Sequence, residues 1–322
     1  MGADRPGDAD MPADDHPDRR DDQDGTGDHA ARAGNTRAET RTRQEYYTNL
    51  RVTVSREESA VARQVTAEEQ AAGQKWQEKV AESRWMWSEY QRKWPPAERS
   101  SADRSTGQPG SWRGDGNRHL EAPENSRVEA ECDRIAKREE ERISPAMRAV
   151  ESQDPDRSLV GFERRLKDRD RIKEKVYDKM EEFSCSAEEA VSVVSDTIRY
   201  TFQYREARYT QGVWTDLERL KGEGFKLHQL KNSWSGEEYK GINSQWIEPD
   251  TGRRFEVQFH TRISFEAEQL THDAYERLRT QEADEFEKMV LKAFQRKVSA
   301  EIPIPPGAAD IPDYSERDAD AR

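Results

Sequence analysis

The sequence predicts a mixed α/β or α+β fold, in which helices flank a central mixed β-sheet. Between residues 124 and 305, segments with helical spacing alternate with short runs of β-branched and aromatic residues. Two such runs flank EPDTG at 248–252, a sequence typical of a hairpin turn. Charged residues make up 37% of the 322 residues, against roughly 25% in an average globular protein. The core is therefore confined to part of the chain.

The N-terminus and the overall composition exclude several classes of protein. Residues 1–40 hold eleven carboxylates and five arginines but no Val, Ile, Leu, Phe, Tyr or Trp, so we expect a disordered acidic tail. No run approaches the ~20 apolar residues of a membrane span, and none resembles a signal peptide. Cys132 and Cys185 are too few for a disulfide scaffold. These features favour a cytoplasmic protein without a membrane segment, with export by a route without a cleavable signal left open.

A tryptophan-rich helical segment is expected at 41–95. Its apolar residues are spaced by one or two helical turns: Val61, Val65, Ala72, Trp76 and Val80. Pro95 and Pro96 end the pattern, because proline cannot continue a helix. This extra N-terminal helix either folds back onto the main domain or docks onto another protein. The Ser-, Gly- and Pro-rich residues 96–123 are expected to form a linker, or an irregular loop pinned by Trp112.

Capping signals place the first elements of the main domain, 124–305. Ser144 and Pro145 fit the N-cap and first-turn proline of a helix, and Ser186 with Glu189 has the spacing of a capping box. In chain order we expect two helices over 128–135 and 143–150, an apolar run at 159–162, a basic helix within 164–176, a short helix from 186, and a strand at 197–204.

The second half of this domain is read in the same way. Apolar residues from Tyr209 to Leu220 step along a helix that Gly222 and Gly224 end. The remaining elements are expected to be strands at 225–231, 243–248 and 254–261, followed by helices at 263–281 and 283–300. We expect 306–322 to be a second disordered tail.

The last strand is the most informative segment. Because side chains alternate between the faces of a strand, Phe255, Val257 and Phe259 are expected to face the core. Glu256, Gln258 and His260 occupy the alternate, polar positions of FEVQFH and are therefore expected to line the opposite face. A solvated sheet face would produce the same alternation, so this strand alone does not establish a site.

Charged residues elsewhere suggest what such a site would bind. Asp196 precedes the strand that contains Arg199, and one carboxylate from each of two strands is a common way to hold Mg²⁺. Arg165, Lys167 and Lys175 form R-x-K-x7-K, which can face a polyphosphate near a helix N-terminus. The alternative is an ordinary charged helix face. Tyr239, in the loop 231–243, offers either a ring for base stacking or a buried anchor for the loop.

In their order and spacing these motifs resemble the nucleotidyltransferase-like synthetase domain of the RelA/SpoT superfamily. This superfamily includes alarmone synthetases, other nucleotide pyrophosphokinases and related toxins, and the resemblance covers roughly residues 155–280. It implies transfer of pyrophosphate from ATP to a ribose 3′-hydroxyl. Glu256 would bind Mg²⁺ and position or deprotonate that hydroxyl, and Asp196 would be the second metal ligand.

The resemblance also implies roles for the other residues. Arg165, Lys167 and Lys175 would hold the ATP phosphates, with Arg199 near the donor. On the acceptor side it implies a stacking ring, phosphate or ribose contacts and orienting groups, supplied by Tyr239, Lys231, Asn243, Gln258, His260, Thr261 and His272. Alarmone synthetases usually have arginine at the position of His260 and often histidine at that of Asn243, so a guanine nucleotide should not be assumed as acceptor.

Three functions are therefore compatible with the sequence. The first is a Mg²⁺-dependent pyrophosphokinase that acts on a free nucleotide and releases AMP. The second is a toxin of the same fold that modifies the 3′ end of tRNA or depletes adenine nucleotides, although the net charge of −13 provides no global attraction for RNA. The third is an inactive interaction module. No hydrolase domain precedes the synthetase region in the sequence, and the oligomeric state is open.

Overall fold

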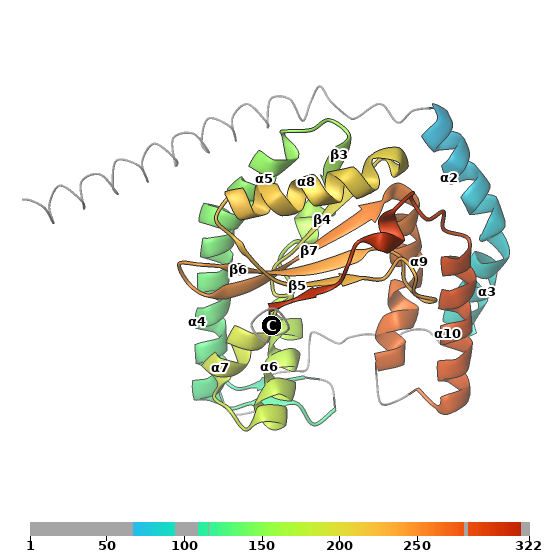
Figure 1. Cartoon of the computed structure of the whole chain (residues 1–322). Coiled ribbons are helices and arrows are strands. Elements are labelled where there is room, and N and C mark those ends of the chain that lie inside the picture. Colours follow the sequence, from blue (N-terminus) through green and yellow to red (C-terminus); the bar gives the residue numbers. More distant parts are fainter. Residues whose placement is uncertain (1–66, 94–108, 115, 280–282, 317–322) are drawn as a thin grey trace, which may run out of the picture. The chain divides into compact units, whose positions relative to one another are not determined.

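A six-stranded mixed sheet forms the centre of the computed structural model (Figure 1). The structure describes residues 67–93, 109–114, 116–279 and 283–316, all of them within the unit Thr53–Arg322. The expected tail 1–40 lies outside the described residues, as do 41–66 and 94–95 of the tryptophan-rich segment, 96–108 of the linker region and the last six residues.

The strand order confirms the predicted mixed sheet. The strands are β3 (Arg157–Val160), β4 (Arg199–Tyr204), β5 (Lys226–Asn232), β6 (Ile242–Glu248), β7 (Arg253–Thr261) and β8 (Tyr314–Ser315). They lie in the order β3-β4-β7-β6-β5-β8, in which only β4 and β7 are parallel. The predicted hairpin at 248–252 joins β6 to β7. Strands β4 and β7 therefore begin at the same end of the sheet.

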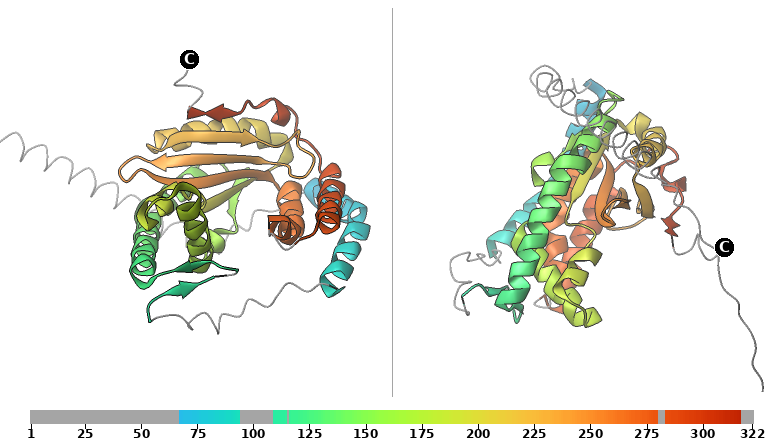
Figure 2. Two further views of the ribbon diagram at one scale, coloured as in Figure 1. Left: turned by 90° about the horizontal axis from the view of Figure 1, so that it is seen from below. Right: turned by 90° about the vertical axis from the view of Figure 1, so that its left-hand side faces the viewer.

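Helices flank this sheet, as the further views show (Figure 2). They are α2 (Ala67–Lys79), α3 (Ala81–Lys93), α4 (Ala122–Arg138), α5 (Ser144–Glu151), α6 (Arg169–Phe183), α7 (Ala187–Val193), α8 (Tyr209–Gly222), α9 (Arg262–Arg279) and α10 (Glu285–Ala300). Helix α7 begins with the predicted capping box of Ser186 and Glu189. Shorter turns are the π-turn η1 (Glu139–Ile143) and the 3₁₀ turns η2 (Phe162–Arg164), η3 (Glu206–Arg208) and η4 (Ala308–Asp310), and β1 (Trp112–Arg113) pairs with β2 (His119–Leu120).

Helix α5 begins at Ser144 with Pro145 in its first turn, but the predicted N-cap role of Ser144 is wrong. Helix α4, η1 and α5 form one continuous helical run, and Ser144 has helical backbone angles instead of a cap conformation. Its amide bonds to the carbonyl of Glu139, five residues earlier. Because proline in a helix clashes with the carbonyl four residues before it, the wider π-turn accommodates Pro145 without ending the helix.

The tryptophan-rich segment folds back onto the main domain where it is described. It forms two helices that meet at Val80, and Trp76 and Val80 are buried in the main core. In the second helix, Trp87 stacks on Phe294 of α10 with ring centroids 5.0 Å apart. Trp85 remains 64% exposed. Docking of a protein partner on 41–95 therefore stays a prediction.

Two segments expected to be irregular are ordered parts of the fold. In the region expected to be a linker, Trp112 is buried and donates a hydrogen bond to Asp170 of α6 (2.9 Å), which fits the pinned-loop alternative. In the segment expected to be a disordered tail, Ile311 is buried, and β8 pairs with β5. A few apolar side chains and two strand residues order these segments. That pattern is too weak to recognise in an acidic sequence. Among the described helices, none combines the length and apolar character needed to cross a membrane.

Candidate active site

The polar face of β7 is buried, so the solvated-face alternative is wrong. Phe255, Val257 and Phe259 fill the core on one side, as the alternation predicts. On the other side Glu256, Gln258 and His260 are only 9%, 6% and 0% exposed. Buried polar groups are costly unless they are hydrogen-bonded. Their partners therefore show what this face is organised to hold.

Glu256 is held by groups on two neighbouring strands. Its register partner on β4 is Arg199, and the Arg199 Nε lies 3.3 Å from a Glu256 oxygen. The Gln258 amide donates to the other oxygen (3.0 Å), while its own oxygen accepts from Thr201 (3.1 Å). The carboxylate of Glu256 is thus fixed in orientation by a cation and an amide. Such orientation is what a metal ligand or a base for a bound hydroxyl requires.

Asp196 lies just before β4 and gathers three cations. Its Oδ2 is 3.0 Å from the Lys167 ammonium, 2.5 Å from that of Lys175, and 3.6 Å from the Arg199 guanidinium. Burial opposes ionisation of this carboxyl, but the two lysines outweigh it and hold the pKa of Asp196 well below its usual range. Burial lowers the pKa of Lys175. The sequence predicted that Lys167 and Lys175 share one face, but not that both pair with Asp196 where β4 begins.

The local backbone explains why Lys167 and Lys175 converge. The Lys167 amide donates to the Thr197 carbonyl (3.0 Å), which ties the segment before α6 to the start of β4. Asp168 then caps α6 by accepting bonds from the amides of the next turn. Lys175 lies two turns into this helix, so its side chain reaches the same carboxylate as that of Lys167.

The carboxylates of Asp196 and Glu256 are the ligand type expected for Mg²⁺, the cofactor that the resemblance implies. Arg199 lies between them, 3.6 Å from an oxygen of Asp196 and 3.3 Å from one of Glu256, so both carboxylates border a position that holds a positive charge. Mg²⁺ prefers carboxylate oxygens and retains several waters. Asp196 and Glu256 would hold the ion. Within the described residues no group of three or more His, Cys, Asp or Glu side chains suited to a metal is present.

Arg165 is not brought together with the other two cations of its motif. Its Nε donates to Glu139 (2.7 Å) and to Ser144 (3.2 Å), behind β4. Glu139 has no exposed surface, and its Oε1 also accepts a bond from the Tyr200 hydroxyl (2.5 Å). A buried carboxylate must be paired. Arg165 provides that pairing, which the motif alone could not show.

On the acceptor side, Tyr239 and His260 form one hydrogen-bonded unit. The Tyr239 hydroxyl donates to Asn243 (2.9 Å) and lies 2.7 Å from His260 Nε2, and His260 Nδ1 lies 2.8 Å from the Ser264 hydroxyl. Burial, and then the charge of Arg199, lower the pKa of His260 to about 3, so its ring is neutral. Burial raises the pKa of Tyr239 well above its usual value. Tyr239 is partly buried, with its hydroxyl end anchored.

The close approach of this loop to β7 depends on a glycine. A Cβ on Gly241 would lie 2.8 Å from a carbon of the His260 ring and 3.0 Å from the Tyr239 hydroxyl. Carbon atoms cannot approach so closely without displacement, so any larger residue would separate the loop from the strand. The loop position of Tyr239 is therefore set by Gly241 and His260 together.

The other predicted acceptor residues have different positions. Lys231 and Asn243 are register partners on β5 and β6, and Asn243 is also the partner of Gln258, so these three share one row and one face of the sheet. The buried Thr261 instead exchanges hydrogen bonds with Ser264 in the first turn of α9, which is a capping role. His272 is exposed on α9, and its Nδ1 lies 3.8 Å from the carboxylate of Asp273. Among the residues that the structure describes, no contact joins His272 to the site.

Sequence reasoning missed several side chains on the polar face. Arg254 and Gln245 belong to this face by register, and Ser264 reaches it from α9 through His260. Alternation alone was a sufficient signal for Arg254, which is two residues before Glu256. Ser264 could not be found in this way, because its contact depends on how α9 packs against β7.

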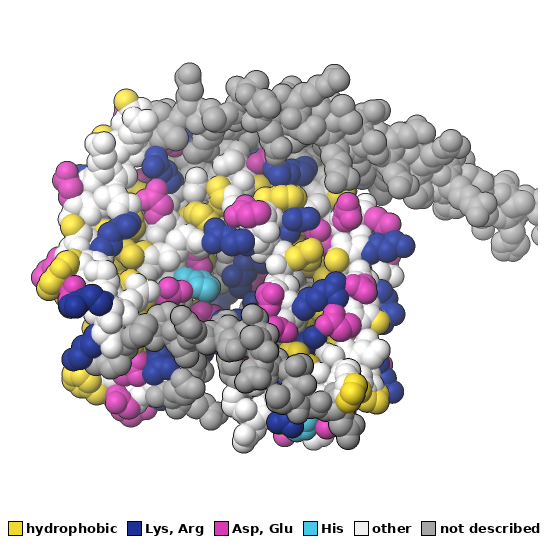
Figure 3. All heavy atoms as spheres, turned by 180° about the vertical axis from the view of Figure 1, so that it is seen from behind, with side chains coloured by type: hydrophobic (Ala, Val, Ile, Leu, Met, Phe, Trp, Pro, Cys, Tyr) yellow, Lys and Arg dark blue, Asp and Glu magenta, His cyan; other side chains and the backbone are white. Residues whose placement is uncertain are grey.

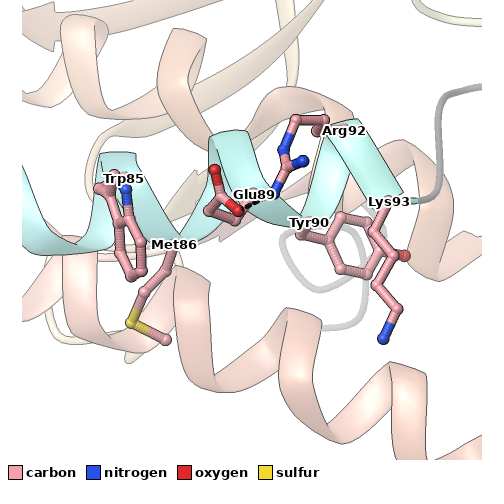
Figure 4. A pocket seen from close by; sticks show the side chains of 6 residues that line it. All are labelled: Trp85, Met86, Glu89, Tyr90, Arg92 and Lys93. Carbon is pink, nitrogen blue, oxygen red and sulfur yellow. Dashed lines mark hydrogen bonds and ion pairs between the residues drawn. The ribbon is translucent and has the colours of Figure 1, made fainter.

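The molecular surface has a hollowed face and a separate depression. Figure 3 shows a hollow around which Lys and Arg side chains gather beside carboxylates and a histidine. The depression lies on α3, measures about 390 Å³, and is lined by Trp85, Met86, Glu89, Tyr90, Arg92 and Lys93 (Figure 4). Its residues include none of those predicted for the site.

The comparisons with known proteins found similar solved structures and no other relatives. No protein-family model matches the sequence, and no curated protein does. The small alarmone synthetase 1 from Bacillus subtilis, solved with its product pppGpp, is 12% identical, with a TM-score of 0.31 over 45% of this chain and 72% of that chain. A GTP pyrophosphokinase family protein from Streptococcus pneumoniae is 14% identical, with a TM-score of 0.34 over 55% and 85%.

A third solved structure, smu.1046c from Streptococcus mutans UA159, is 18% identical, with a TM-score of 0.37 over 51% of this chain and 86% of that chain.

Proposed function

We propose that this protein is a Mg²⁺-dependent pyrophosphokinase that transfers the β,γ-pyrophosphate of ATP to the ribose 3′-hydroxyl of a nucleotide. The observation that carries the proposal is the row formed by Asp196, Arg199 and Glu256, in which one guanidinium faces two carboxylates on the same side of the sheet. Mg²⁺ bound by these carboxylates would neutralise charge on the transferred phosphates.

Glu256 is the group best placed to act on the acceptor. One of its oxygens is held by Gln258, and the strand carries it next to the row that contains Asn243. A carboxylate in this position can orient the 3′-hydroxyl and accept its proton. The acceptor oxygen then bonds to the β-phosphorus of ATP, the bond from that phosphorus to the α,β-bridging oxygen breaks, and AMP leaves with the electron pair.

The cations around Asp196 supply the electrostatic part of the reaction. Phosphoryl-type transfer depends on an in-line nucleophile and neutralised oxygens more than on covalent participation by the protein. Lys167, Lys175 and Arg199 already lie within 3.6 Å of one carboxylate oxygen. This spacing lets them share an anion that approaches the same position.

The acceptor half offers neutral hydrogen-bonding groups for a base and a ribose. Tyr239 presents a partly buried ring whose hydroxyl is fixed, while Asn243 and the neutral His260 hold it in place. A ring fixed in this way can stack on a nucleobase at little entropic cost. An assay with several candidate acceptors identifies which nucleotide binds in this half.

The test follows β,γ-labelled ATP with Mg²⁺ and GDP, GTP, AMP, ADP, ATP or bulk tRNA as acceptor. We expect label on a nucleotide together with release of AMP. Glu256→Gln should reduce the rate by about a thousandfold, since it removes both a metal ligand and the proton acceptor. Glu218→Gln, an exposed carboxylate on α8 paired with Lys221, is the matched control and should be fully active.

The possible outcomes are distinct. Label on tRNA instead of a nucleotide would assign the protein to the tRNA-modifying alternative. Unchanged turnover in Glu256→Gln would refute the site. Folded protein that binds ATP but transfers label to none of these acceptors would refute the proposed activity.

A further inference from the structure

Two adjacent arginines at the start of β7 have opposite surroundings. Arg253 lies on the core side, where its guanidinium is 3.1 Å from Glu131 of α4 and donates to the Val191 carbonyl of α7 (3.4 Å). Arg254 points to the other face, because neighbouring strand residues alternate. Its side chain is partly buried and makes no hydrogen bond or ion pair within the described part of the chain. Arg253 therefore has a structural role, whereas the side chain of Arg254 has no partner in the part of the chain that the structure describes.

Arg254 shares its face with Glu256. The register of β6 and β7 pairs Arg254 with Ile247 and Glu256 with Gln245, without an irregularity between them. Two residues along a strand correspond to about 7 Å. A guanidinium at this distance from Glu256 is within reach of a ligand that Glu256 contacts.

The row that joins Arg199 to Glu256 divides this face into two halves. On β7, Gln258 and His260 follow Glu256, and Asn243 and Tyr239 are bonded or paired to these positions. Arg254 precedes Glu256. Because β4 and β7 are parallel, it lies at the strand end where Asp196 gathers Lys167 and Lys175. Arg254 therefore belongs to the cationic half.

We infer that Arg254 is a ligand for the phosphate chain of the donor nucleotide, in the role that the sequence motif assigned to Arg165. The inference rests on the proposed function, since it takes the donor to be a nucleoside triphosphate. Arg165 is committed to the buried Glu139, whereas Arg254 presents a fork of donors that is unpaired among the described residues and suits phosphate oxygens. In this assignment, the guanidinium that contacts the donor phosphates comes from Arg254 of β7.

The experiment measures binding and turnover separately in the full-length protein. Mg·ATP is titrated calorimetrically into wild type, Arg254→Gln, Arg254→Lys and Arg253→Gln, and the KM values for ATP and for the acceptor are then determined. Loss of a charge-assisted hydrogen bond typically weakens binding by about tenfold or more. We expect Arg254→Gln to raise the Kd for Mg·ATP by about tenfold or more and Arg254→Lys to raise it less. The acceptor KM should be unchanged in both variants.

Arg253→Gln is the matched control, because it removes the same charge one residue away on the other face. It should lower thermal stability through loss of the Glu131 pair and leave the Kd for Mg·ATP unchanged. Equal Kd values for wild type and Arg254→Gln would overturn the inference, and so would a raised acceptor KM with intact ATP binding. Wild type that binds Mg·ATP without transferring it refutes the proposed activity alone, and wild type that fails to bind it refutes both.

Discussion

Strand β7 separates two buried regions that differ in chemistry. On its core face, Phe255, Val257 and Phe259 have no exposed surface, and Phe259 stacks on Phe202 with centroids 6.2 Å apart. On its polar face, Glu256 and Gln258 are nearly as buried but are surrounded by charged and amide groups. Apolar burial stabilises a fold, whereas polar burial is at best close to neutral. Burial alone therefore does not distinguish a core position from a site position on β7. The chemical nature of the neighbouring groups does.

The sharpest way to test this contrast is to measure stability on both faces. Phe259→Ala should lower the free energy of unfolding by about 3–5 kcal/mol, because it leaves a cavity among packed rings. Glu256→Gln should change it by only about 1 kcal/mol, since the Arg199 it pairs with is a third exposed. Urea denaturation of the two variants provides the measurement. A loss in Glu256→Gln as large as that in Phe259→Ala would show that the polar face also supports the fold.

A second test concerns the charged group behind β4. Glu139 is buried and paired with Arg165, whose side chain is a quarter exposed. Glu139→Gln should therefore destabilise the protein by about 3 kcal/mol, at the lower end of the range for breaking a buried pair. Tyr200→Phe removes one hydrogen bond to the same carboxylate and should cost about 1 kcal/mol. Equal losses in the two variants would mean that the ion pair contributes nothing beyond a hydrogen bond.

The third test concerns a pH dependence that arises on the polar face. His260 is packed against Tyr239 and Ser264, and burial lowers its pKa to about 3, with a further contribution from Arg199. An unfolded histidine has a pKa of about 6.5, so between these values only the unfolded chain takes up the proton. The group stabilises the fold fully above pH 6.5 and loses this contribution as the pH falls. Between pH 8 and pH 5 the loss should be about 2 kcal/mol.

The measurement is the free energy of unfolding at intervals across this pH range, for wild type and His260→Gln. The variant should be less stable at pH 8 and show a flatter curve toward pH 5. An identical slope in both proteins would place the titrating group elsewhere.

The sequence predicted the features that depend on residues close together along the chain. The alternation of FEVQFH predicted which side chains share a face, and the capping box at Ser186 predicted the start of α7. The convergence of Lys167 and Lys175 also followed from their spacing, whereas their pairing with Asp196 did not.

What the sequence could not predict depends on contacts between distant segments. The orientation of Arg165 is decided by Glu139, which is 26 residues earlier. The burial of the polar face depends on α9 and on the loop of Tyr239, neither of which changes the alternation of β7 itself. The π-turn before Pro145 was missed because a proline after a serine is typical of a helix start.

The pairing of β8 with β5 affects how the protein can be shortened. Strand β5 lies between β6 and β8. Asp313 and Glu316 bond to residues of β5, and within the described part of the chain the strand residues that pair with its outer side are Tyr314 and Ser315. A strand edge with unpaired amides and carbonyls is a template for pairing between copies of a chain. A form that ends before residue 314 would present this edge to solvent and should self-associate, so these two residues protect the protein against aggregation.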